Sequence, residues 1–134
     1  MLSELGPETI DAILDVGGPG SGSPLLSLEV RQLGGEIARP RPEHGALASI
    51  EAGYGLYAVG VAPAPEAATA VRGHLELLKE TLAPWTARHT YLNFCDTRRD
   101  PATLWEEQAH RRLGRIKDAV DPDGLIRSNH PVRA

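Results

Sequence analysis

The spacing of apolar residues changes abruptly at Pro65, and this change constrains the fold more than any other feature of the sequence. From Pro65 to Leu82 apolar residues recur every three or four positions, which is the spacing of one helix face. The preceding run, Tyr54–Ala62, contains the β-branched Val59 and Val61 and is bounded by a proline, as is typical of a strand. The chain therefore predicts an α+β fold, with an antiparallel β-sheet and helices packed on one face.

Other segments predict further elements of this fold. In residues 25–33, Leu26, Leu28 and Val30 alternate with polar residues, so these three side chains are expected to face the core of a half-buried strand. Residues 46–50 and 54–62 resemble a hairpin, and residues 89–94 a short strand. Helices are expected over residues 6–16, from 65 to just before Pro84, and from an Asp100 cap to about residue 120.

Length, charge and cysteine content limit the class of protein. The 134 residues suit one domain, and no apolar run approaches the roughly 20 residues of a membrane span. A net charge of −4 argues against nucleic acid as a partner. Residues 1–8 lack the basic and apolar parts of a signal peptide, which predicts a cytoplasmic protein. Cys95 is the only cysteine, so it is expected to act as a small hydrophobic residue.

Common catalytic and metal-binding motifs are missing from the sequence. The five histidines show no spacing of three or four residues on a helix, so no metal site is expected. The glycine-rich segment 17–24 has neither the P-loop ending nor the dinucleotide-binding spacing and is interpreted as a flexible turn. A serine-hydrolase elbow is also missing. The basic stretch 111–117 is either a solvated helix face or a docking face toward another domain.

Three ordered stretches near the C-terminus carry a resemblance to a known family. They are Tyr91–Asp96 (Tyr-Leu-Asn-Phe-Cys-Asp), Arg112–Lys117 (Arg-Leu-Gly-Arg-Ile-Lys) and Val120–Pro131, which begins Val-Asp-Pro-Asp-Gly-Leu-Ile-Arg. Their order and spacing resemble the ending of berberine-bridge-type FAD-linked oxidases. The segment Ser23–Gly35, with its terminal Gly-Gly pair, is similar to a strand of that family's substrate domain.

The resemblance implies a role for the chain and for three of its residues. Residues 1–134 would form a single partial substrate-binding domain, with the family's C-terminal region at about residues 88–132. Tyr91 matches a tyrosine that, in several members, acts as a base on a substrate hydroxyl. Asn93 and Asn129 match positions that hold the flavin ring or tether the strand and the C-terminal tail. Phe94 replaces a tyrosine often found in the family, and no segment resembles its FAD-binding N-terminal domain.

Several functions follow as expectations. The first is the substrate-domain portion of an FAD-dependent oxidoreductase that oxidises a small-molecule alcohol or amine, with oxygen as acceptor. FAD would then need a site completed by a flavin-domain protein or by a homodimer. The alternative is a cofactor-free small-molecule-binding or scaffold protein derived from that domain. A third is a cofactor-free enzyme that uses Tyr91 and a histidine as acid and base.

Overall fold

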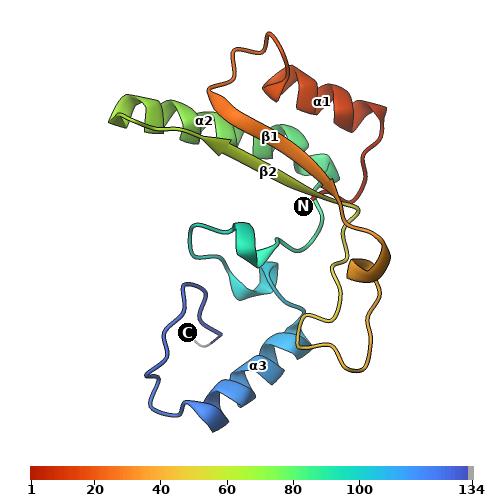
Figure 1. Ribbon diagram of the computed structural model, residues 1–134, viewed down its shortest axis with the longest axis vertical. Coiled ribbons are helices and arrows are strands. Elements are labelled where there is room, and N and C mark those ends of the chain that lie inside the picture. Colours follow the sequence, from red (N-terminus) through yellow and green to blue (C-terminus); the bar gives the residue numbers. More distant parts are fainter. Residues whose placement is uncertain (133–134) are drawn as a thin grey trace. The chain divides into compact units, whose positions relative to one another are not determined.

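The computed structural model describes residues 1–132, which divide into two compact units. Residues 1–34 and 52–87 make up the first unit, whereas residues 35–51 and the chain from residue 88 onward make up the second. Within the first unit, β1 (Leu25–Gln32) and β2 (Tyr54–Gly60) form an antiparallel pair. The predicted α+β class is confirmed, with α1 (Pro7–Gly17) and α2 (Pro65–Leu82) beside the strands (Figure 1).

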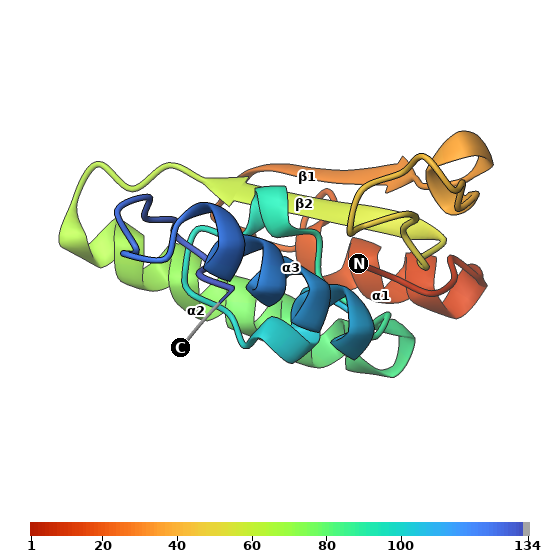
Figure 2. The same cartoon turned by 90° about the horizontal axis from the view of Figure 1, so that it is seen from below.

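Both helices of the first unit pack on the same face of the two strands, as predicted (Figure 2). Each begins with a proline in its first turn, where the missing N–H costs no hydrogen bond. The core centres on Leu2, Leu78 and Leu82, against which side chains of α1 and both strands pack. Because Leu2 pairs through its backbone with Tyr54, the N-terminal residues also bound one edge of β2.

A β-bulge between Leu25 and Ser27 changes which residues of β1 face the core. Leu25 pairs with Gly60, but Ser27, and not Leu26, starts the regular register at Val59. The extra residue shifts the alternation, so that Leu25 packs against the core while Leu26 is 71% exposed. The prediction that Leu26 faces the core is therefore wrong.

The predicted strand at residues 46–50 does not form. These residues lie in the 21-residue connection between β1 and β2 (residues 33–53), and β1 takes the place that the hairpin prediction gave to them. Instead of a ladder, Ile50 donates one backbone hydrogen bond to Ile37, and His44 Nδ1 lies 2.6 Å from the carbonyl oxygen of Ala48. The segment is apolar, but no strand lies beside it to form a ladder, so its backbone is irregular.

The second unit contains one longer helix, α3 (Glu107–Val120), and three 3₁₀ turns, η1 (Gly35–Ala38), η3 (Leu92–Phe94) and η4 (Pro101–Thr103). The strand predicted at residues 89–94 is wrong, because the N–H groups of Phe94 and Cys95 bond back to Tyr91 and Leu92 and close a tight turn.

The helix predicted from Asp100 to about residue 120 is interrupted near its start. Asp100 does cap a turn, since its carboxylate accepts the N–H of Ala102 at 2.9 Å. The turn ends at Thr103, and the buried Leu104 and Trp105 follow in irregular backbone before α3 begins at Glu107. Within residues 1–132, no helix combines the length and apolar character needed to cross a membrane.

Candidate functional site

Tyr91 is the N-cap residue of η3, and its position is fixed by contacts with the turn that follows it. Its carbonyl oxygen accepts the backbone N–H of Phe94 at 3.0 Å and lies 3.5 Å from Sγ of Cys95. The Phe94 ring meets the Tyr91 ring edge to face, with 5.1 Å between the ring centroids and 86° between the ring planes. Such contacts orient the phenol, which is only partly buried.

Asn93 lies beside the Tyr91 phenol, although the strand expected to place them together does not form. The amide nitrogen Nδ2 of Asn93 is 3.4 Å from Oη of Tyr91, at the long end of hydrogen-bond distances, and the Asn93 side chain is exposed. The 3₁₀ turn brings residues 91 and 93 close by curvature, whereas a strand would have done so by alternation.

The C-terminal tail returns to this turn through His130. Its Nε2 lies 3.1 Å from the carbonyl oxygen of Cys95, and because a carbonyl oxygen only accepts, Nε2 carries the proton of this bond. The other ring nitrogen, Nδ1, is buried without a hydrogen-bond partner in the described structure. The neighbouring Asn129 is exposed, and the bond of His130 is what ties this part of the tail to the turn.

Asp121 organises the turn between α3 and the tail. The buried carboxylate accepts the N–H groups of Leu125 at 2.9 Å and Ile126 at 3.0 Å, and it pairs with the Lys117 ammonium group. The hydrogen bond from Lys117, with the two backbone donors, holds the pKa of Asp121 below its ordinary value. Lys117 also donates to the carbonyl oxygen of Ile126 at 2.5 Å, which closes the turn.

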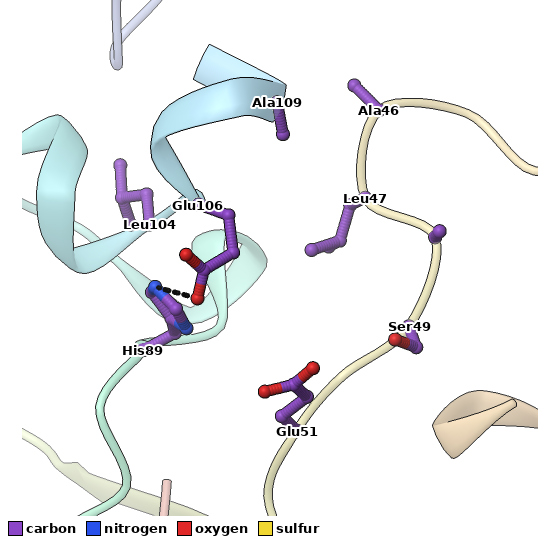
Figure 3. A pocket seen from close by; sticks show the side chains of 9 residues that line it. Ala46, Leu47, Ser49, Glu51, His89, Leu104, Glu106 and Ala109 are labelled. Atoms are coloured by element: carbon purple, nitrogen blue, oxygen red, sulfur yellow. Dashed lines mark ion pairs between the residues drawn. The ribbon is translucent and has the colours of Figure 1, made fainter. Parts of the chain in front are cut away.

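A small hollow of about 160 Å³ is the other notable feature of the second unit (Figure 3). Leu47 and Leu104 form part of its apolar wall, and Glu51, His89 and Glu106 supply polar groups. His89 Nε2 is 3.5 Å from Oε1 of Glu106, an ion-pair distance without hydrogen-bond geometry, so this buried nitrogen lacks a hydrogen bond in the described part of the chain.

Sequence reasoning did not single out the pair formed by His89 and Glu106. The two residues are 17 positions apart and are joined by the irregular segment that replaces the first part of the predicted helix. Arg88 also reaches Glu106, with 3.2 Å between Nη1 and Oε1. No repeat, motif or periodicity in the sequence would have identified this contact.

The chain was compared with models of known protein families, with curated proteins and with solved structures. None of them matches.

Neither of the two hollows in the second unit fits FAD as a complete site. Drug-sized ligands already occupy pockets of about 300–1,000 Å³, and FAD is larger. The hollow beside His89 is too small, and a second hollow of about 460 Å³ lies along the C-terminal turn next to Lys117 and Arg127. Neither is lined by Tyr91, Asn93 or Asn129. These three residues could provide at most part of one wall.

The described residues also offer no candidate metal site. Among residues 1–132, no group of three or more histidine, cysteine, aspartate or glutamate side chains is arranged to hold a metal ion.

Proposed function

We propose that this chain is the substrate-domain portion of an FAD-dependent oxidoreductase of the berberine-bridge type and works with a flavin-binding partner. The substrate would be a small-molecule alcohol or amine, with oxygen as acceptor, and a cytoplasmic location is part of the proposal. The observation that carries it is the cluster formed by Tyr91, Asn93 and the returning tail, because these elements come from two of the stretches that resemble the family.

Within this proposal, Tyr91 takes a proton from a substrate hydroxyl. The edge contact with Phe94 fixes the phenol ring, while Asn93 offers an N–H donor toward the phenol oxygen. A hydrogen bond from Asn93 would hold the phenol oxygen in a fixed position toward the substrate hydroxyl. No reaction step through the flavin is assigned, since the described residues do not complete a site for it.

A flavin titration tests the proposal. FAD absorbance and fluorescence would be followed with the purified full chain alone, and again with a recombinant flavin-binding domain from an oxidase of this type. We expect saturable changes only when both proteins are present, because neither hollow found among residues 1–132 is large enough for the dinucleotide. Absence of any change under both conditions would overturn the oxidase assignment.

Two matched tyrosine variants separate a catalytic role from a structural one. Tyr91→Phe removes the phenol oxygen and should reduce substrate-dependent flavin reduction by about 10²- to 10⁴-fold in the two-protein mixture, while FAD binding is retained. Tyr57→Phe removes a phenol from β2, in the other unit, and should leave the rate unchanged. Equal rates for the two variants would contradict the role of Tyr91.

The hollow beside His89 favours a second candidate function, that of a cofactor-free small-molecule-binding protein. Two carboxylates, Glu51 and Glu106, and an apolar wall suit a small organic cation (Figure 3). Titration of the full chain with methylammonium, monitored by NMR, tests this alternative. Saturable shifts at His89, which lines the same hollow, that disappear in Glu106→Gln, without any response to FAD and the flavin domain, would favour it over the oxidase portion.

A further inference from the structure

One edge of β1, the edge away from β2, pairs with no strand of the first unit. We propose that a strand of the flavin-binding partner pairs with this outer edge. This inference rests on the proposed function, since that function requires a second polypeptide. The occupant is an extended segment of about five or six residues, the usual length of a strand, with apolar side chains at alternate positions. The partner chain would thus extend the two-stranded sheet by one strand.

The hydrogen bonds of the hairpin decide which residues of β1 face this edge. Leu33 donates its N–H to the carbonyl oxygen of Gly53 at 2.9 Å, and alternation along an antiparallel ladder then directs the odd-numbered residues of β1 toward β2. The hydrogen bonds of Tyr54, which is opposite Gln32 in the register, support this assignment. Both its N–H and its C=O bond to Leu2 on the other side of β2, at 3.1 and 2.8 Å.

The backbone groups of Leu28, Val30 and Gln32 therefore point to the outer edge. No strand in the described part of the chain pairs there. Natural edge strands are often protected by proline, lysine or a β-bulge. The bulge of β1 lies at Leu25–Ser27, before these three positions, and the strand contains neither proline nor lysine. These three alternate residues each direct an N–H and a C=O group to the outer edge. Another extended backbone can form hydrogen bonds with all of these groups.

Apolar side chains surround the same edge and remain uncovered. Val30 lies on the helix-facing side of β1, two residues after the core-packed Leu28 and opposite the core-packed Leu56, yet it is 36% exposed. Ile10 and Leu14 of α1 are 41% and 52% exposed. They share one helix stripe with Gly17, whose Cα is so close to the Leu28 side chain that a Cβ would lie 2.3 Å from Cδ2. The Gly17 end of this stripe therefore lies against β1.

The position of α1 indicates where the added strand would lie. Figure 1 shows α1 beyond β1, on the side away from β2, and Figure 2 shows it in the layer beneath the strands. The helical layer thus extends farther than the two-stranded sheet above it. A strand hydrogen-bonded to β1 would cover Ile10, Leu14 and Val30 with its apolar side and would place its other side next to the paired charges of Glu29 and Arg31.

A second copy of the chain does not suit this edge. If two β1 strands paired about a two-fold axis, the α1 helix of the copy would enter the layer beneath β1 and β2. That layer already holds α1 and α2, which pack on each other and on the core. A strand from a different chain need not bring a helix into this layer, so it can pair with β1 without such a clash.

Amide exchange in the isotope-labelled full chain tests the inference. The probe is a nine-residue peptide of alternating threonine and valine with a lysine at each end. We expect the peptide to slow exchange of the Leu28, Val30 and Gln32 amides by about tenfold, with no change at Leu33, which is already bonded within the hairpin. Leu14→Lys should abolish this protection. Leu77→Lys, at a similarly exposed leucine of α2, should preserve it.

Three outcomes would overturn the inference. The first is an unchanged exchange rate at millimolar peptide, and the second is an equal loss of protection in the two lysine variants. The third is protection of the same amides when the chain alone is concentrated, which would assign the edge to a second copy. Since the peptide carries no flavin, failure of the FAD titration with protection intact would overturn the oxidase proposal and preserve strand addition as a property of this edge.

Discussion

The imidazole Nε2 of His130 lies 3.1 Å from the carbonyl oxygen of Cys95, so the C-terminal tail is tied to the turn that carries Tyr91. His130→Ala removes this bond and should destabilise the tail by about 1 kcal/mol, the usual value for one hydrogen bond. Limited proteolysis should then cut residues 122–132 faster. The control is His74→Ala, which removes a similar bond to the Val16 carbonyl oxygen in the other unit. Equal cleavage of the tail in both variants would contradict the assignment.

Asp121 should make the stability of the second unit depend on pH. Its pKa is lowered in the folded chain, chiefly by Lys117, so its contribution is present above the unfolded pKa of about 3.9. The contribution is lost as the pH falls below that value and through the folded pKa. Thermal unfolding measured from pH about 6 to about 2.5 should therefore show Asp121→Asn less stable than the unmodified chain at the upper end and similar to it at the lower end. A constant difference across this range would be inconsistent with the assigned role.

Two glycines offer a paired test of how closely β2 packs on α2. A Cβ on Gly60 would lie 2.6 Å from both methyl carbons of Val71, so Gly60→Ala should cost about 1–3 kcal/mol through overpacking. Gly73 in α2 has open space at the same position, and Gly73→Ala should stabilise the helix by about 0.5–1 kcal/mol. Chemical denaturation of the two variants measures both effects. If the signs do not differ, β2 and α2 are not in this close contact.

Leu82 should be among the most sensitive positions of the first unit. It is almost completely buried with Leu2 and Leu78, and truncation to alanine should cost about 2–5 kcal/mol. Leu77 occupies the same helix with an exposed side chain, so Leu77→Ala should change the free energy of unfolding by less than about 1 kcal/mol. Denaturation curves compare the two, and a similar loss in both would show that this core is not as described.

Local periodicity predicted most of the regular elements, because each of them carries its own pattern. The helices near residues 6–16 and 65–83 and the strand at 25–33 agree with α1, α2 and β1 to within one or two residues. Failures occurred where the outcome depends on distant partners. Residues 46–50 and 89–94 have strand-like composition, but the described structure gives neither a neighbouring strand.

The candidate site was only partly accessible to sequence reasoning. The closeness of Tyr91 and Asn93 follows from their separation of two residues and occurs in a tight turn as it would in a strand. In contrast, the contact between His130 and Cys95 spans 35 residues, and that between His89 and Glu106 depends on an irregular segment. The bulge at Leu25–Ser27 is likewise set by pairing with β2 and has no local signal.

The division of the chain into interleaved units has a consequence for its synthesis. Residues 35–51 are inserted between the two paired strands, yet they belong to the unit formed with the chain from residue 88 onward. As the polypeptide leaves the ribosome, the first unit has all its residues once Ala87 has emerged. The inserted segment lacks the rest of its unit until α3 and the tail are made. Slow translation after residue 87 should therefore lengthen the time for which a chaperone or protease can reach residues 35–51.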